Sequence, residues 1–191
     1  NLTQEIRKNL LKLAQVKEET YTAVLMQGSG TFGVESVLGS SVGSDGKLLI
    51  CANGAYGKRM AQIAEKNQLS YLLYEENYDK IPDAKKISNL LDANPDITHV
   101  SMVHSETTSG ILNDIAAVAN IVKAKGKTMI VDAMSSFGGI PIAIEQLGID
   151  FLISSANKCI QGVPGFSFII CKRAALLECK GKSHSLSLDL Y

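Results

Sequence analysis

The sequence predicts an α/β fold, with a mostly parallel sheet of about seven strands that includes one antiparallel strand. Short continuous apolar runs alternate along the chain with helical patterns, which is typical of parallel strands covered by helices on both faces. The 191 residues are 46% hydrophobic and 20% charged, enough for one large domain with a sizeable core. Only the segment ANKCIQGVPG separates the last two apolar runs. That is too short for a usual parallel crossover, so we expect this pair to be antiparallel or otherwise irregular.

The elements follow one another in a regular order. An amphipathic helix opens the chain, because Ile6, Leu10, Leu13 and Val16 form one apolar stripe. Seven strand-like runs follow, at Tyr21–Met26, Leu48–Ala52, Ser70–Tyr74, His99–Val103, Thr128–Val131, Phe151–Ser154 and Phe166–Cys171. Helical patterns lie between most of them, at residues 31–41, 55–67, 83–93 and 114–125.

Composition excludes several classes of function. The formal net charge of zero provides no attraction to nucleic acid or to an anionic membrane. The longest apolar runs are far too short to cross a bilayer, and the charged, amphipathic start is not a signal peptide. No two of the four cysteines form a C-x-x-C pair, and the three histidines lack metal-ligand spacing. Because Cys51 and Cys171 lie in apolar runs, as buried thiols do, we expect a cytoplasmic protein without a metal.

A glycine-rich loop joins the first strand-like run to the next helix. Its glycines, Gly28, Gly30 and Gly33, form a literal G-x-G-x-x-G, the pattern of a dinucleotide-binding turn. Such a fold also needs an acidic residue at the end of the second strand, to hold the ribose hydroxyls. Here the second run leads into Asn53, and the nearest acid, Asp45, precedes that run. The dinucleotide interpretation is therefore weak.

The same loop can hold a different anion. Ser29, Gly30 and Thr31 stand at a helix N-terminus, where free N–H groups and the helix dipole favour negative charge. The plain alternative is a hydroxyl-capped helix behind a glycine turn. Asp132 directly follows one strand-like run, and Lys158 follows another. Because the carboxyl ends of parallel strands share one edge, we expect the anion site, the carboxylate and the lysine to converge, as pyridoxal phosphate requires.

Five segments resemble the class V aminotransferases of PLP fold type I: GSGTFGVE, NGAYGKRM, HSETTSGILN, VDAMSSFGGIPI and SSANKCIQGVPGFSF. The resemblance covers essentially the whole sequence. It implies a three-layer α/β/α large domain, the cofactor pyridoxal 5'-phosphate and a homodimer. The implied activity transfers the amino group of 2-aminoethylphosphonate to pyruvate, giving phosphonoacetaldehyde and L-alanine. The alternatives are another class V aminotransferase, of alanine–glyoxylate or serine–glyoxylate type, and a non-catalytic fragment.

The resemblance implies a role for each matched residue. Lys158 matches the lysine that bonds covalently to the cofactor and then carries a proton. Asp132 matches the carboxylate that keeps the pyridinium nitrogen protonated. Tyr56 matches an aromatic residue that stacks on the cofactor ring, with a core tyrosine at a helix start as the alternative. For His104 a structural role is expected ahead of a catalytic one.

The remaining matched residues surround the cofactor. Residues 29–31 match the turn that binds the cofactor phosphate, and Asn157 matches a polar residue that reaches the same group. Thr107 matches a hydroxyl near the phenolic oxygen of the ring, and Thr108 is a neighbouring candidate that the sequence does not separate from it.

The family's substrate-binding arginine has no match here. In the family that arginine, and the phosphate contacts of the neighbouring subunit, come from the C-terminal half. This sequence has only Arg7, Arg59 and Arg173, and none of them lies in a motif that matches the family's substrate-binding arginine. We therefore expect residues 1–191 to be the cofactor-binding large domain, without the family's N-terminal segment and C-terminal small domain. By itself this domain is expected to be inactive in transamination.

Overall fold

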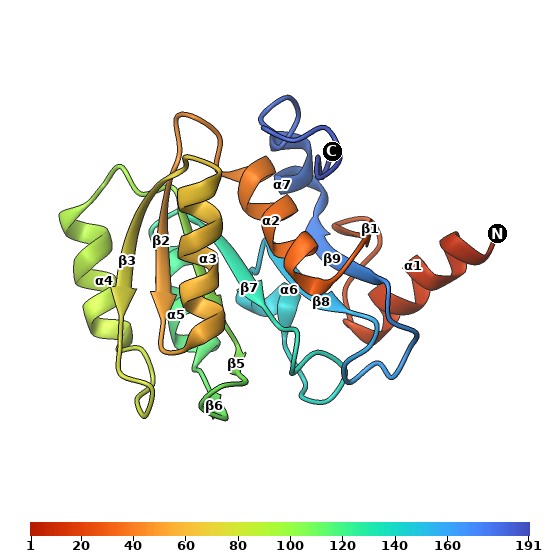
Figure 1. Ribbon diagram of the computed structural model, residues 1–191, viewed down its shortest axis with the longest axis horizontal. Helices are drawn as coiled ribbons and strands as arrows, with labels where there is room; N and C mark the ends of the chain where they lie inside the picture. Colours follow the sequence, from red (N-terminus) through yellow and green to blue (C-terminus); the bar gives the residue numbers. More distant parts are fainter.

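A seven-stranded sheet forms the centre of the protein in the computed structural model, which describes residues 1–191 (Figure 1). Its strand order is β1-β9-β8-β7-β4-β2-β3. The strands are β1 (Tyr21–Gln27), β2 (Lys47–Ala52), β3 (Ser70–Glu75), β4 (His99–Val103), β7 (Thr128–Asp132), β8 (Phe151–Ser155) and β9 (Phe166–Lys172). Strand β9 pairs antiparallel with both of its neighbours, and every other pairing in this sheet is parallel. The predicted fold class is confirmed, including its single antiparallel strand.

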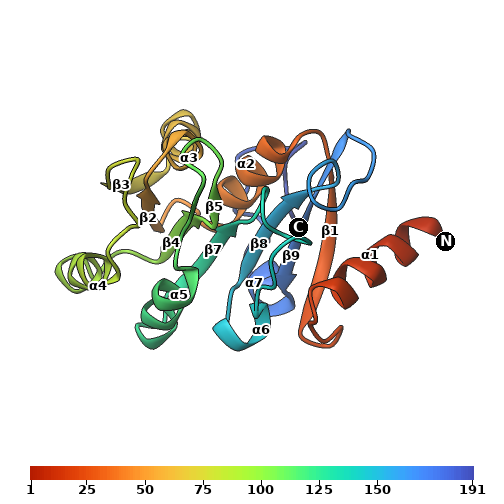
Figure 2. The ribbon, with the colours of Figure 1, turned by 90° about the horizontal axis from the view of Figure 1, so that it is seen from below.

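Helices cover both faces of the sheet and complete three layers. Figure 2 shows α2 and α3 on one side and α4 and α5 on the other. Two apolar cores lie between the layers, one against each face. The helices that pack on the first core are α1 (Leu2–Leu13), α4 (Ala84–Ala93), α5 (Ile115–Ala124) and α6 (Ile144–Leu147). The helices on the second core are α2 (Gly30–Ser41), α3 (Ala55–Lys66) and α7 (Arg173–Glu178).

Local chemistry explains where two of these helices begin. The side chain of Asp83 accepts hydrogen bonds from the amides of Lys85 and Lys86, at 2.7 and 3.4 Å, and so caps α4. Asp114 caps α5 in the same way, through the amide of Ala117 at 2.9 Å. A carboxylate in this position satisfies amides that have no partner inside the helix and faces the positive end of the helix dipole.

Four short elements were not predicted, and the first helix is shorter than its apolar stripe. The unpredicted elements are a small hairpin of β5 (Ser105–Glu106) and β6 (Ile111–Leu112), together with α6 and α7. Helix α1 ends before Val16, because Gln15 adopts a positive φ of 54°. Val16 still packs against the first core from outside the helix, whereas Leu13 is 49% exposed.

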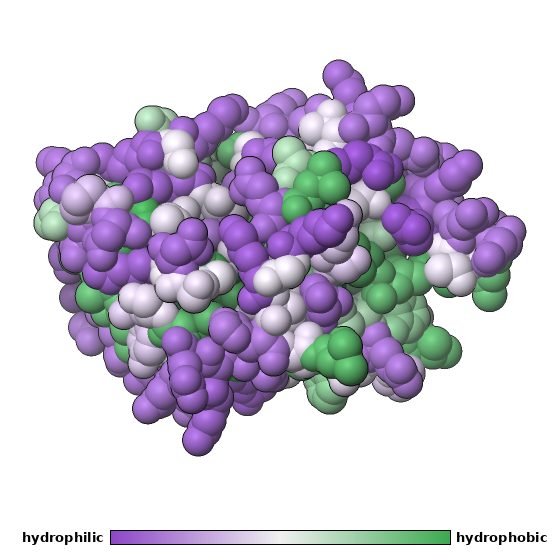
Figure 3. All heavy atoms as spheres, turned by 90° about the horizontal axis from the view of Figure 1, so that it is seen from above, coloured by the Kyte–Doolittle hydropathy of each residue, from purple (hydrophilic) through white to green (hydrophobic).

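The carboxyl ends of the parallel strands meet at the lower edge of the sheet in Figure 1, to which the arrows of β2 and β3 point. The turns that lead into α2 and α3 lie there, as do the segments that follow β4, β7 and β8. Viewed from above, the molecule is mainly hydrophilic, with hydrophobic residues gathered toward the side from which α1 projects (Figure 3). None of the helices combines the length and the apolar character needed to cross a membrane.

Candidate active site

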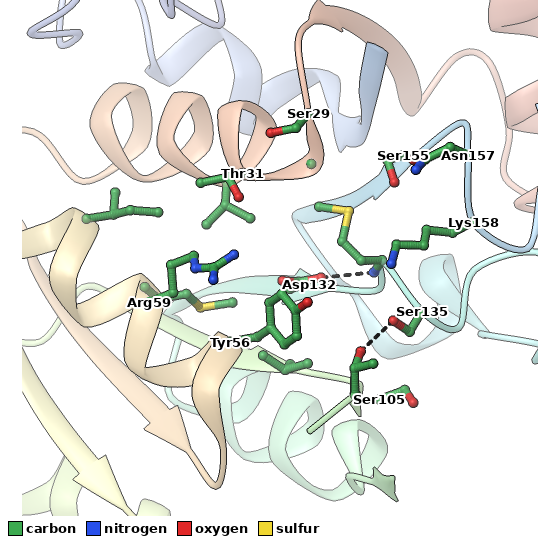
Figure 4. A pocket seen from close by; sticks show the side chains of 17 residues that line it. Ser29, Thr31, Tyr56, Arg59, Ser105, Asp132, Ser135, Ser155, Asn157 and Lys158 are labelled. Carbon is green, nitrogen blue, oxygen red and sulfur yellow. Dashed lines mark hydrogen bonds between the residues drawn. The ribbon is translucent and has the colours of Figure 1, made fainter. Parts of the chain in front are cut away.

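A cavity of about 190 Å³ opens at the carboxyl edge of the sheet, between the starts of α2 and α3 and the ends of β4, β7 and β8. Figure 4 shows side chains from these separate elements pointing into it. The structure brings together all eight site residues that the sequence analysis named. They are Ser29, Gly30, Thr31, Tyr56, Thr107, Asp132, Asn157 and Lys158.

The start of α2 forms one wall of the cavity. Gly28 adopts a φ of 111°, which favours glycine, and turns the chain from β1 into the helix. A Cβ on Gly30 would lie 2.6 Å from Sδ of Met134, so the glycine allows the loop after β7 to approach. Ser29 is the N-cap residue, yet its side chain makes no capping hydrogen bond. The first amides of α2 have no partner inside the helix, so this wall is suited to an anion.

Asp132 forms the floor of the cavity. It ends β7, between Val103 of β4 and Ile153 of β8, and it is 4% exposed. Burial raises the pKa of its carboxyl to about 6, and the hydrogen bond from the amide of Met134 to Oδ1, 2.9 Å long, opposes this rise. The negative Glu106 also raises this pKa, while Lys158 lowers it. Oδ2 accepts no hydrogen bond from the protein, so a donor in the cavity can use it.

Lys158 reaches the cavity from the loop between β8 and β9. Two backbone hydrogen bonds of 2.8 Å hold the start of this loop, from Gln161 to the carbonyl of Lys158 and from Gly162 to that of Ala156. The lysine forms none of the protein's five salt bridges. In Figure 4 its side chain extends toward the side of the cavity where Asp132 and Tyr56 lie. The amine is therefore available to a ligand.

Helix α3 contributes an aromatic ring and a cation. Tyr56 is half-buried in its first turn, and the guanidinium carbon of Arg59 lies 5.0 Å from the centre of the tyrosine ring. Both side chains face the cavity, since residues three apart share one face of a helix (Figure 4). Arg59 lies in the segment NGAYGKRM, but the sequence analysis gave it no role. Its spacing from Tyr56 on a predicted helix was a signal that could have identified it.

The two neighbouring threonines, Thr107 and Thr108, have different contacts in the structure. The hydroxyl of Thr107 lies 2.7 Å from that of Ser135, and both residues line the cavity. The hydroxyl of Thr108 instead donates to Glu106 at 2.7 Å and accepts from the amide of Ala55 at 3.2 Å. Thr107 is therefore the threonine placed to meet a ligand.

Other lining residues were missed because only the folded chain brings them together. Each lies within a few residues of the end of a strand, in segments that the sequence analysis did quote. They are Ser105, Met134, Ser135 and Ser155. Asn157 lines the cavity beside Lys158, as predicted for its position.

His104 lies outside the cavity lining. It is 6% exposed, and its Nδ1 lies 2.9 Å from the hydroxyl of Ser136. Its amide donates to the carbonyl of Asp132 at 2.8 Å, and burial lowers the pKa of its ring. These contacts place the histidine as a support for the end of β7.

The residues present fit pyridoxal phosphate and do not fit a dinucleotide. The start of α2 can bind a phosphate, and the carboxylate of Asp132 can pair with a protonated ring nitrogen. The ring of Tyr56 can stack on the cofactor ring, and the amine of Lys158 can react with its aldehyde. At the end of β2, where a ribose would be held, the side chain of Asn53 is hydrogen-bonded to Asn113 instead.

Comparisons with known proteins identify the family of this chain. The family model described as "Aminotransferase class-V" matches residues 1–184. The chain is 57% identical over 191 residues to a 2-aminoethylphosphonate–pyruvate transaminase of Lysinibacillus sphaericus (strain C3-41), covering all of this chain and 52% of that protein. It is 53% identical to the protein of the same name from Bacteroides fragilis, again over the whole chain and 53% of the relative. The chain thus spans about half the length of the curated relatives it matches.

Two solved structures share the fold. A pyridoxamine–pyruvate aminotransferase from Mesorhizobium loti superposes with a TM-score of 0.89 at 29% identity, over 97% of this chain and 47% of that one. A ureidoglycine–glyoxylate aminotransferase from Bacillus subtilis has a TM-score of 0.90 at 24% identity, over 98% and 48% of the two chains. The second likeness concerns the fold alone.

Proposed function

The chain belongs to the class-V aminotransferase family, and on that premise we propose that it forms the cofactor-binding domain of a transaminase. The full protein moves the amino group of 2-aminoethylphosphonate to pyruvate and releases phosphonoacetaldehyde and L-alanine. Relatives that are 53–57% identical over the whole chain, and that carry the name of this activity, support the choice of substrates.

The proposed cofactor is pyridoxal 5'-phosphate. The amides of Gly30 and Thr31, the hydroxyls of Ser29 and Thr31, and the side chain of Asn157 would bind its phosphate. When bound, this cofactor supplies an aldehyde that exchanges amino groups and a ring that withdraws electrons.

The other lining residues would orient groups and move protons. Oδ2 of Asp132 would hold a proton on the ring nitrogen, because a negative charge there favours the protonated ring. Nζ of Lys158 would take the proton from the amine-bearing carbon of the amino donor. Tyr56 would cover the ring and exclude water from it, while the hydroxyls of Thr107 and Ser135 would orient its phenolic oxygen.

Three further proposals concern the whole protein. Residues 1–191 make up the large domain, and the family resemblance supports a smaller C-terminal domain and a homodimer around it. Val163, in the loop that carries Lys158, is 71% exposed, and an exposed apolar side chain of this kind suits such an interface. The proposed location is the cytoplasm, supported by four free cysteines, of which only Cys159 is exposed.

One observation carries the proposal. The start of α2, which is suited to an anion, lines the same cavity as Asp132 and Lys158. We expect the full-length protein to form L-alanine from 2-aminoethylphosphonate and pyruvate. Lys158→Ala should lower turnover by about 10³-fold or more, because it removes the amine that moves the proton. Lys12→Ala, on the exposed last turn of α1, is the matched control and should keep full turnover.

Chemical trapping tests the assigned lysine independently of turnover. After the protein is loaded with pyridoxal phosphate and reduced with borohydride, peptide mapping should find the cofactor on Lys158. A label on Lys123 or Lys172 would contradict the assignment. Formation of glycine from glyoxylate, with alanine or serine as donor, would favour the rival glyoxylate type. Cofactor uptake without turnover of any of these pairs would indicate a non-catalytic protein.

A further inference from the structure

Glu106 is a fully buried carboxylate for which the proposed reaction has no use. It ends β5 and is 0% exposed, yet no lysine or arginine pairs with it. Its Oε2 accepts hydrogen bonds from the amides of Tyr56 and Gly57, at 3.2 and 3.3 Å. Its Oε1 accepts from the amide and the hydroxyl of Thr108, at 3.2 and 2.7 Å. Four donors from two separate segments thus converge on one side chain.

These contacts cap α3 from outside the helix. The N-cap residue of α3 is Gly54, which has no side chain to satisfy the first amides. Glu106 takes the second and third amides, and the hydroxyl of Thr108 takes the first, that of Ala55, at 3.2 Å. The carboxylate also faces the positive end of the helix dipole. The end of β5 and the turn that follows it therefore satisfy the amides that the helix leaves free.

Close packing shows that this contact is built into the fold. A Cβ on Gly54 would lie 2.3 Å from both Cγ and Cδ of Glu106. In the first turn of α3, a Cβ on Gly57 would lie 2.7 Å from Cβ of Ala52. The two glycines let the start of α3 lie against the carboxylate and against the end of β2 at once.

Both segments that Glu106 joins carry cavity residues. Tyr56 lies in the capped turn of α3, and its own amide is one of the four donors. Thr107 stands between Glu106 and Thr108, and its hydroxyl meets Ser135 in the cavity. A shift of the carboxylate of Glu106 would therefore move Tyr56 and Thr107 relative to each other.

We propose that Glu106 is a positioning residue, whose buried carboxylate caps α3 and thereby holds Tyr56 and Thr107 in place against the cofactor. The inference rests on the proposed function, since it concerns the binding of pyridoxal phosphate. Glutamine has the shape of glutamate, but it offers one acceptor oxygen and places an NH₂ group against donors. Glu106→Gln therefore disrupts the cap of α3 while keeping nearly the same side-chain volume.

The test uses the full-length protein and measures the dissociation constant for pyridoxal phosphate and the circular dichroism that the protein induces in the bound cofactor. We expect Glu106→Gln to weaken binding about 10-fold and to alter the induced signal, since it forfeits charge-assisted hydrogen bonds. In a Tyr56→Leu background the same change should weaken binding less than about 3-fold, because residues that act through one another are not additive.

A matched control separates positioning from general loss of stability. Asp83→Ala removes the carboxylate that caps α4 through two amides, on the opposite face of the sheet. It should lower the melting temperature while leaving cofactor affinity and the induced signal as in wild type. Equal losses of affinity in the two variants, or full additivity with Tyr56→Leu, would overturn the inference.

A milder variant keeps the test decisive if Glu106→Gln does not fold. Thr108→Val removes one hydrogen bond to Glu106 and the one to Ala55, so it should shift affinity and the induced signal in the same direction by a smaller factor. Unchanged binding in Thr108→Val would then overturn the inference. Wild-type protein that takes up no pyridoxal phosphate would instead overturn the proposed function, and this inference with it.

Discussion

At the scale of single residues, Asp132 shows how a site can oppose the stability of its own fold. Its carboxyl is buried at the end of β7, and burial raises its pKa from 3.8 to about 6 in the cofactor-free protein. One oxygen is bonded to the amide of Met134, while the other faces the cavity without a donor. The charge that the proposed chemistry requires is therefore unfavourable until a cation faces it.

This imbalance gives a stability prediction with a defined sign. Between about pH 4 and pH 6 the folded state binds the proton of Asp132 more tightly than the unfolded chain. Stability therefore falls as the pH rises through this window, and the loss is complete above it. Asp132→Asn should stabilise cofactor-free protein at pH 7.5 by up to about 3 kcal/mol and have little effect at pH 4, as measured by urea unfolding.

The same variant should lose activity, since a neutral amide cannot hold the ring nitrogen in its protonated form. Turnover of the full-length protein should fall by about 10²-fold or more. Asp79→Asn, at an exposed position with no side-chain hydrogen bond, is the control. It should change neither the turnover nor the free energy of unfolding. A turnover near that of wild type in Asp132→Asn would contradict the role assigned to this carboxylate.

At the scale of elements, what could be predicted depended on the length of each pattern. The seven main strands lie within one residue of their predicted ends, because continuous apolar runs mark the inner strands of such a sheet. The edge strand β3 is only partly buried, but its run of apolar and aromatic residues still marked it. The hairpin of β5 and β6 has two residues in each strand, which is too few for any periodicity to appear. The meeting of α2, β7 and β8 followed from topology, but the cap by Glu106 depends on a three-dimensional contact that no local pattern encodes.

Helix α2 allows a prediction with a control in the same helix. Gly30→Ala would place a methyl group 2.6 Å from Sδ of Met134, and that flexible side chain, which lines the cavity, must then move. We expect the variant to fold with a nearly unchanged melting temperature and to bind pyridoxal phosphate about 10-fold more weakly, measured by absorbance titration.

Gly39→Ala supplies the comparison, because a Cβ there meets no atom within 4 Å. This change should stabilise the protein by up to about 1 kcal/mol through helix propensity and leave cofactor affinity as it was. Equal affinities in the two alanine variants would show that the approach of Met134 to Gly30 does not shape the cavity.

At the scale of the whole molecule, the cavity holds few of the cations that the proposed substrate requires. The cavity lining includes a single arginine, Arg59, and the chain spans about half the length of its curated relatives. A phosphonate dianion is bound most strongly by charge-assisted contacts to several cations. The remaining contacts to the substrate are expected outside residues 1–191.

A fragment of residues 1–191 should therefore be inactive even where it folds and takes up the cofactor. Without groups that orient the donor, the advantage of proximity, worth about 7–11 kcal/mol, is lost. The measurement is L-alanine formation by the purified fragment beside the full-length protein, with cofactor absorbance recorded for both. Comparable turnover by the fragment would show that its own residues complete the substrate site.

The reversed direction of β9 has a consequence for how ready the site is before any ligand arrives. The loop that carries Lys158 leaves the sheet at β8 and returns to it at once through β9, so hydrogen-bonded strands hold both of its ends. The amide of Gly28 also bonds to the carbonyl of Gly165, 3.0 Å away, which ties this loop to the start of α2. Much of the conformational entropy of the lysine loop is thus lost during folding and not again on binding. Preorganisation of this kind keeps the backbone at the start of α2 and the backbone that carries Lys158 in a defined relation before a ligand binds. Side chains elsewhere in the lining can then be substituted without disturbing that relation.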